Sequence, residues 1–240
     1  MRRRAVLGLI AGGALALRAA ATGVAGAAWQ GRFDWHDPRP EFGGISAIDL
    51  AADGHGFTAL TDRGQFLTGR LRRDGAGRVA AVEGVEFFPM RDPEGRPRRR
   101  ERADAEGLAV APDGRLYVSF EGHGGGRVWS WADVTAPAEP LPRHDDFRAV
   151  AADFGPDGRF YLLERRFRLP LRFATRLRRF RPGDWGAGEV LLQTPLGQHD
   201  NLEALSVRRD ARGRLRATMV SDDNFLPFQR TEIVEYLLPD

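Results

Sequence analysis

Acidic residues stand at matching positions of a repeated sequence pattern, and together they could hold a cation or activate a water molecule. The pattern is clearest in residues 104–121, where two apolar runs, 108–111 and 116–120, flank a Pro-Asp-Gly turn. Glu106 precedes the first run and Glu121 follows the second. Because the start of one strand lies beside the end of its antiparallel partner, we expect both carboxylates at one edge of a hairpin, away from its turn. The continuous apolar runs predict that both faces of this hairpin are buried.

This unit occurs four times along the chain, and its spacing predicts the fold. The turn glycines are 60, 44 and 55 residues apart, at Gly54, Gly114, Gly158 and Gly213. Short strands and Gly-rich turns at such a period are typical of β-propeller blades. We therefore expect an all-β fold, a β-propeller with four to six four-stranded blades, in which a strand at 29–33 completes the last blade and closes the ring. A β-sandwich with several Asp-Gly hairpins is the alternative, although a sandwich needs no acidic residue at matching offsets.

The other strands of each blade are expected between these hairpins. They are predicted at 70–71, 79–82 and 85–88 for the first blade, 127–131 and 136–142 for the second, 176–180 and 189–192 for the third, and 231–238 for the fourth. The charged stretch 90–103 is interpreted as a solvated loop, with an anion-binding arm as the alternative. No linker divides the chain, so residues 28–240 are expected to form one domain.

The first 27 residues have the pattern of an export signal. Arginines at positions 2–4 precede an apolar run over 5–17, and Ala25-Gly26-Ala27 is a cleavage candidate. The pair Arg3-Arg4 followed by Val6-Leu7 resembles a twin-arginine signal, and the apolar run is short for a bilayer span. We therefore expect removal of residues 1–27 and a periplasmic or secreted product.

Composition narrows the possible partners and chemistries. The formal net charge of +3 becomes −1 without residues 1–27, which carry four arginines and no acid, so no nucleic-acid partner is expected. No other stretch could span a membrane, and a monomer is expected. The chain has no Cys, and all 36 basic residues are Arg, which excludes disulfides, thiolate sites and lysine chemistry. The five histidines lack zinc spacing. His199 is interpreted as an ordinary surface residue, and the alternative is a position near the channel mouth, because it lies four residues before Glu203.

The hairpin argument gathers the acidic residues at one end of the ring. Residues that end second strands are Asp62, Glu121, Glu164 and Asp222, and those that precede first strands are Glu106 and Glu203. Clustered carboxylates raise one another's pKa unless a cation lies among them. The cation could be an arginine, with Arg63, Arg165 and Arg230 nearby in sequence, or Ca²⁺, which accepts irregular oxygen ligands. Alternatively, the acids accept backbone hydrogen bonds and join adjacent blades.

Several ordered motifs resemble the phytase-like β-propeller family, whose domain is described as the esterase-like activity of phytase. The resemblance covers residues 42–238 and rests on Gly43-Gly44-Ile45-Ser46, Thr61-Asp62-Arg63-Gly64, Asp104-Ala105-Glu106-Gly107-Leu108-Ala109, Asn201-Leu202-Glu203-Ala204-Leu205-Ser206, Ser221-Asp222-Asp223-Asn224-Phe225 and Gln229-Arg230-Thr231. It implies an exported propeller that hydrolyses an ester or phosphoester. The third repeat departs from the pattern, with Phe147-Arg148-Ala149-Val150 where Glu-Gly-Leu would stand.

Two functions are consistent with these residues. In the first, the protein hydrolyses a small-molecule ester or phosphoester with a bound Ca²⁺, and the roles are divided as follows: metal ligands Glu106, Glu203, Asp222 and Asp223; water-steering carboxylates Asp62 and Glu164; charge-neutralising arginines Arg63 and Arg230. In the second, the propeller binds a ligand or acts as a scaffold, and the same acids are structural or hold a structural ion.

Overall fold

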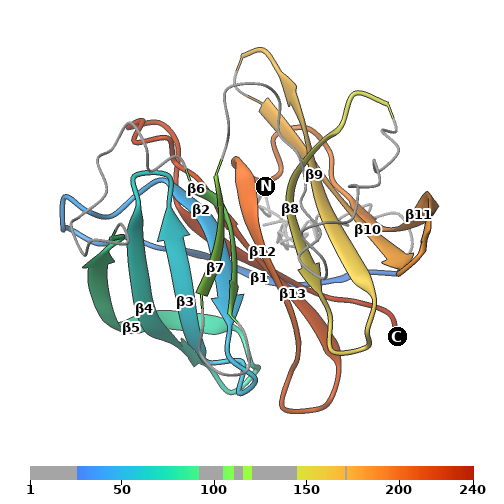
Figure 1. Ribbon diagram of the computed structural model, residues 1–240, viewed down its shortest axis with the longest axis horizontal. Coiled ribbons are helices and arrows are strands. Elements are labelled where there is room, and N and C mark those ends of the chain that lie inside the picture. Colours follow the sequence, from blue (N-terminus) through green and yellow to red (C-terminus); the bar gives the residue numbers. More distant parts are fainter. Residues whose placement is uncertain (1–25, 92–104, 111–115, 121–144, 171) are drawn as a thin grey trace, which may run out of the picture.

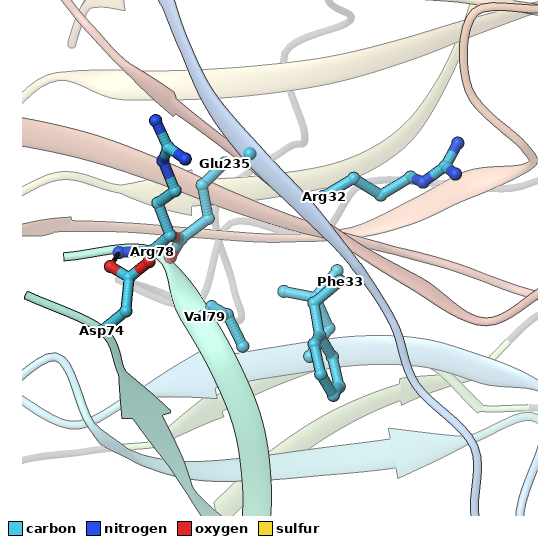
Figure 2. A pocket seen from close by; sticks show the side chains of 8 residues that line it. Arg32, Phe33, Asp74, Arg78, Val79 and Glu235 are labelled. Atoms are coloured by element: carbon cyan, nitrogen blue, oxygen red, sulfur yellow. Dashed lines mark hydrogen bonds between the residues drawn. The ribbon is translucent and has the colours of Figure 1, made fainter. Parts of the chain in front are cut away.

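The computed structural model describes residues 26–91, 105–110, 116–120, 145–170 and 172–240. This part of the chain is all β (Figure 1). Its strands are β1 (Ala28–Asp34), β2 (Ile45–Leu50), β3 (Gly56–Thr61), β4 (Gln65–Arg73), β5 (Val79–Pro89), β6 (Ala105–Val110), β7 (Leu116–Phe120), β8 (Arg148–Phe154), β9 (Phe160–Arg168), β10 (Arg172–Arg181), β11 (Asp184–Gln193), β12 (Leu202–Arg209), β13 (Leu215–Ser221) and β14 (Glu232–Leu237). Within these residues no helix is long and apolar enough to cross a membrane.

Consecutive antiparallel strands form the sheets. Two four-stranded sheets have the orders β2-β3-β4-β5 and β8-β9-β10-β11, and β6 pairs with β7. The third four-stranded sheet has the order β12-β13-β14-β1, so the first strand of the chain is the outer strand of the last sheet. Phe33 pairs with Ile233 in that sheet, which confirms the predicted pairing of segment 29–33 with the C-terminal unit.

The innermost strands of the sheets contact one another in cyclic order. Strand β12 contacts β2 and β8, and β6 contacts the same two strands. These four strands begin at the end of the molecule that lies at the top of Figure 1, which we call the upper end. The β2–β3, β8–β9 and β12–β13 turns lie at the opposite, lower end. Residues before an inner strand and after its neighbour therefore meet at the upper end, as the antiparallel argument predicts.

Apolar side chains fill the spaces between neighbouring sheets. One cluster, which includes Leu163, Leu205 and Tyr236, joins the β8–β11 sheet to the last sheet. A second, which includes Ile48 and Val220, joins the last sheet to the first. A third places Leu60 of β3 against partly buried side chains of β6 and β7. Each sheet thus has an apolar face directed at a neighbour, as expected for strands that would otherwise expose that face to water.

At the lower end, Arg208 of β12 ties three inner strands together. Its Nη1 donates to Asp153 Oδ2 of β8 at 2.9 Å, its Nη2 donates to Asp49 of β2, and its Nε donates to the Leu50 carbonyl at 2.9 Å. Ser206 Oγ also accepts the Leu50 N–H at 3.1 Å. Side chains therefore connect inner strands that belong to different sheets.

Some sequence predictions differ from the structure or lie outside the described residues. The β6–β7 hairpin is not buried throughout, because Leu116 is 42% exposed. Segments 79–82 and 85–88 form one strand, β5, with an irregularity in pairing near Gly84, where φ is 62°. Glu121, the Pro-Asp-Gly turn and the segments predicted at 127–131 and 136–142 lie outside the described residues.

Candidate functional site

Each inner strand has an irregularity in pairing near its start. The register shifts across the second residue of β2, β6 and β12 and across the third residue of β8. The residues at these positions are Ser46, Glu106, Glu203 and Val150, respectively. A bulge turns a side chain away from the direction that strict alternation would give it, and bulges are frequent beside active sites. Two of the four positions carry predicted ligands, and the third repeat has Val150 at its equivalent position.

Four predicted acidic residues lie close enough at the upper end to affect one another. Asp62 follows β3, Glu203 lies in β12, and Asp222 and Asp223 follow β13. Burial, together with the negative charges of Glu203, Asp62 and Asp223, raises the pKa of Asp222 to about 8. The Asp222 residue is only 5% exposed. The structure therefore brings together carboxylates that are up to 161 residues apart in the sequence.

The Gly43-Gly44 pair allows the backbone to approach this cluster. The Gly44 N–H donates to Asp223 Oδ1 at 3.1 Å, and the Gly44 carbonyl accepts the Asp62 N–H at 2.9 Å. The φ angle of Gly44 is 63°, and a Cβ there would lie 2.6 Å from the Phe225 ring and closer still to Asp62 Oδ1. Only glycine fits both this conformation and this space.

The turn after β13 is held in an uncommon conformation by the two aspartates. Asp222 Oδ1 accepts the Asn224 N–H at 2.7 Å, and Asp223 Oδ1 accepts the Phe225 N–H at 3.0 Å. Asn224 and Phe225 have φ angles of 48° and 53°. Left-handed backbone at residues other than glycine persists where the surroundings fix it, and it is frequent at binding sites. The predicted residue Arg63 lies with its guanidinium over the Phe225 ring.

Arg165, which the sequence offered only as a candidate cation among the acids and not as a catalytic residue, contacts the acidic site directly. From the end of β9 its Nη1 donates to Asn201 Oδ1 and to Glu203 Oε1. Asn201 in turn accepts the Asp222 N–H through its carbonyl at 2.9 Å. Successive strand side chains point to opposite faces, so either Glu164 or Arg165 had to face β12, and the structure selects the arginine.

Glu164 lies on the other face of β9, apart from the acidic cluster. It is buried, and its carboxylate accepts hydrogen bonds from Arg176 Nε at 2.7 Å and from Arg178 Nε and Nη2 at 2.8 and 2.7 Å. Its charge is thus matched by two arginines from β10. Arg230 lies on the upper loop, where its Nη2 is 3.9 Å from Glu232 Oε2.

His199 is buried close to this site, contrary to the prediction of a surface residue. Its Nε2 is 2.9 Å from the Tyr236 hydroxyl, its ring stacks on Trp29 at 5.4 Å, and its Nδ1 is 3.7 Å from Glu232 Oε1. Burial lowers the pKa of His199 to about 4, with a smaller contribution from the Arg32 charge. Burial also raises the pKa of Glu232, whose Oε1 accepts the Asp200 N–H at 2.7 Å.

The donor set has the chemistry of a calcium site but not its geometry. Carboxylate oxygens are the ligands that Ca²⁺ prefers. Among the described residues, however, no three His, Asp or Glu side chains are grouped as metal ligands. Asp223 uses both oxygens in hydrogen bonds, because Thr231 Oγ1 donates to Oδ2 at 3.1 Å. As arranged, these residues do not fit a bound calcium ion.

These features define an all-β protein of repeated antiparallel sheets that collects acidic residues at one end of its inner strands. Comparison with protein families gives the particular family. The chain matches the phytase-like family, described as the esterase-like activity of phytase, over residues 40–130 and 124–225, and it belongs to this family. A search of the curated proteins finds no match.

Proposed function

We propose that this protein is a four-bladed β-propeller that hydrolyses an ester or phosphoester at its upper end. The cyclic contacts of β2, β6, β8 and β12 support four blades around one axis. The main support for the functional proposal is that acidic residues from two sheets lie close together, namely Asp62, Glu203 and Asp222. Arg165, from a third sheet, donates a hydrogen bond to one of them, Glu203. Family membership supports an esterase-type activity.

The proposed chemistry uses groups already present at the site. Asp62 steers the attacking water as a general base, and arginine guanidinium groups stabilise the negative charge that develops on the substrate. Arg63 and Arg165 are the nearest candidates for this second role, and Arg230 is exposed on the adjoining loop. In this scheme Glu164 has a positioning role, because its charge is held between two arginines on the other face of β9.

Calcium would relieve the repulsion within the acidic cluster. The proposed ligands are Glu106, Glu203, Asp222 and Asp223, whose side chains would have to rearrange around the ion. We assign no step of the reaction to calcium. Thermal unfolding with added Ca²⁺ and with a chelator measures binding directly, since an ion that binds only the native state raises the melting temperature.

A screen of chromogenic esters and phosphoesters tests the hydrolase proposal. We expect turnover by the wild-type protein, and a loss of about a hundredfold or more in Asp62→Asn and Glu203→Gln. Glu83→Gln is the matched control, because this acidic residue is 56% exposed on an outer strand. Equal turnover in all variants would reject the site, and absence of wild-type turnover on every substrate would reject the activity.

The second candidate function is a ligand-binding or scaffolding propeller. It is favoured by the hydrogen bonds of Asp223, which join the Gly43-Gly44 segment to the β13–β14 loop. In that case Asp62→Asn and Glu203→Gln should alter the melting temperature or ligand binding, without any turnover to lose.

The proposal includes export of a monomer to the periplasm or the medium, with residues 1–27 as the signal. Replacing Arg3 and Arg4 together by lysine should block export if the route is the twin-arginine pathway. N-terminal sequencing of the exported product should begin at Ala28. Accumulation of the intact chain inside the cell would contradict this part of the proposal.

A further inference from the structure

Exposed apolar side chains are distributed unequally between the two ends of the molecule. Within the described residues, the large apolar side chains that are exposed in connecting loops are Leu169, Leu196, Leu226 and Phe228. All four lie at the upper end, in the β9–β10, β11–β12 and β13–β14 connections. A connecting loop has no need of an exposed leucine or phenylalanine, and such residues often mark an interaction surface.

The described turns at the lower end, between β2 and β3 and between β12 and β13, are formed without exposed large apolar side chains. They are built around aspartates that accept backbone N–H groups of their own turns. Asp53 accepts those of His55 and Gly56, and Asp210 accepts those of Arg212 and Arg214. These turns satisfy their own polar groups and face water, so the repeat does not by itself require apolar loops.

The β9–β10 hairpin forms a projecting tongue at the upper end, which we define as residues 166–170 and 172. Strand β8 pairs with β9 only as far as Arg165, and β11 pairs with β10 only from Arg176. The β9–β10 ladder continues beyond both limits to the Arg168–Arg172 pair. In Figure 1 this hairpin rises at the top of the view, above the neighbouring sheets.

The tongue combines an apolar tip with arginines. Leu169 is 84% exposed, and the partly exposed Phe167 ring packs against Phe173 at 5.4 Å. Arg168 and Arg172 flank the tip; the Arg168 side chain is 52% exposed and pairs with Asp146. Arginine binds phosphate oxygens with two parallel hydrogen bonds, while its aliphatic stem can lie along apolar surface.

We propose that the tips of the tongue and of the β13–β14 loop dock this protein onto an anionic lipid surface. The tips would place Leu169, Leu226 and Phe228 among the acyl chains, and the arginines would contact lipid phosphates. Separate apolar tips on projecting turns suit a deformable lipid layer better than the continuous packed core of a protein interface. Charge complementarity at the tongue argues for anionic lipid. Residues 166, 168 and 172 are all arginine, and the one carboxylate that pairs with Arg166 and Arg168, that of Asp146, leaves an excess of positive charge there. The inference is independent of whether the acidic site catalyses a reaction.

Co-sedimentation of the purified chain with vesicles tests the proposal. We expect binding to vesicles of phosphatidylcholine with phosphatidylglycerol, weaker binding to phosphatidylcholine alone, and weaker binding at high salt. Leu169→Asp and Phe228→Asp should each lower the partition coefficient by about tenfold or more. Arg168→Gln should lower it by about fivefold, and only on the anionic vesicles.

Phe154→Asp is the matched control. Phe154 is 57% exposed at the lower end, and the substitution adds the same charge to the chain. This variant should bind vesicles as the wild type does, and circular dichroism should show that all variants fold. The proposal would be overturned if Phe154→Asp lost as much vesicle binding as Leu169→Asp, or if Leu169→Asp bound as the wild type does. It would also be overturned if the wild type did not bind anionic vesicles. A dimer in solution that Leu169→Asp dissociates would overturn it as well, because a second copy would then cover the tongue.

Discussion

The buried histidine at position 199 should make the stability of this protein depend on pH. His199 is 5% exposed. In the neutral tautomer with its proton on Nδ1, Nε2 accepts a hydrogen bond from the Tyr236 hydroxyl while Nδ1 faces Glu232. Protonation would place a positive charge in a desolvated site. Burial accordingly lowers the pKa of His199 from 6.5 to about 4, and the Arg32 charge contributes in the same direction.

The sign and size of the effect follow from proton linkage. Between pH 6.5 and about 4 the unfolded chain binds a proton at this histidine and the native protein does not. The stabilisation is therefore complete above pH 6.5 and is lost as the pH falls towards 4. One pKa unit corresponds to about 1.4 kcal/mol, so the full loss is about 3 kcal/mol, and about 2 kcal/mol of it is reached near pH 5.

Urea unfolding of the wild type and of His199→Gln at about pH 7.5 and about pH 5 measures the contribution of His199 to the pH dependence of stability. Glutamine can still accept the Tyr236 hydroxyl but cannot be protonated. We expect the wild type to lose about 2 kcal/mol more than the variant between the two pH values. The buried acid Glu232 is present in both proteins, so its own titration largely cancels from the difference.

His36→Gln is the control, because His36 is an exposed histidine in the loop after β1. It should unfold with the same pH dependence as the wild type. The reasoning would be refuted if His199→Gln lost as much stability as the wild type on acidification, because the native site would then accommodate the imidazolium.

Three further predictions concern close contacts and charges. Gly44→Ala should destabilise the protein by about 3 kcal/mol through backbone strain and steric overlap. Gly84 has a similar φ of 62°, but no atom lies within 4 Å of where its Cβ would be, so Gly84→Ala should cost about 1 kcal/mol. Thermal unfolding of the two variants measures the difference. Arg208→Met should lower the free energy of unfolding in urea by about 3 kcal/mol, because it leaves the partly buried carboxylates of Asp49 and Asp153 without their arginine. Arg70→Ala removes one partner of the exposed Arg70–Asp53 pair and should lower it by less than about 1 kcal/mol. Asp222→Asn should raise the melting temperature near neutral pH while reducing hydrolysis. With its pKa raised to about 8, the Asp222 carboxyl must take up a proton to be buried at that pH, whereas asparagine is neutral without one.

Different results would contradict each of these arguments. Equal costs at Gly44 and Gly84 would show that backbone conformation alone decides, without the contact to Phe225. A small effect of Arg208→Met would show that water replaces the guanidinium. A lower melting temperature for Asp222→Asn would show that the Asp222 carboxylate stabilises the native state.

The sequence predicts the local features of this fold well, because they depend on neighbouring residues. Asp-Gly turns specify the hairpins through bonds such as that from the Arg212 N–H to Asp210 Oδ1 at 2.9 Å. The acidic cluster followed from antiparallel geometry. It was harder to predict to which face of a sheet a side chain points. A pairing irregularity near the start of each inner strand interrupts the alternation of side chains between the two faces. Glu164 and Arg165 are neighbours in β9 and were both candidates, and the sequence could not decide which of them faces β12. The burial of His199 depends on Trp29, far away in the sequence.

The two ends of the inner strands divide stability from chemistry. At the lower end, Asp49 and Asp153 occupy equivalent positions in two repeats, and one arginine, Arg208, binds both. At the upper end, the equivalent bulge positions differ between repeats, and burial together with the neighbouring acids raises the pKa of Asp222. A fold that holds its inner strands firmly at one end can tolerate unfavourable charge at the other. Substitutions in the Arg208 network at the lower end should therefore lower the free energy of unfolding without changing the proposed turnover, and substitutions of the carboxylates at the upper end should change that turnover.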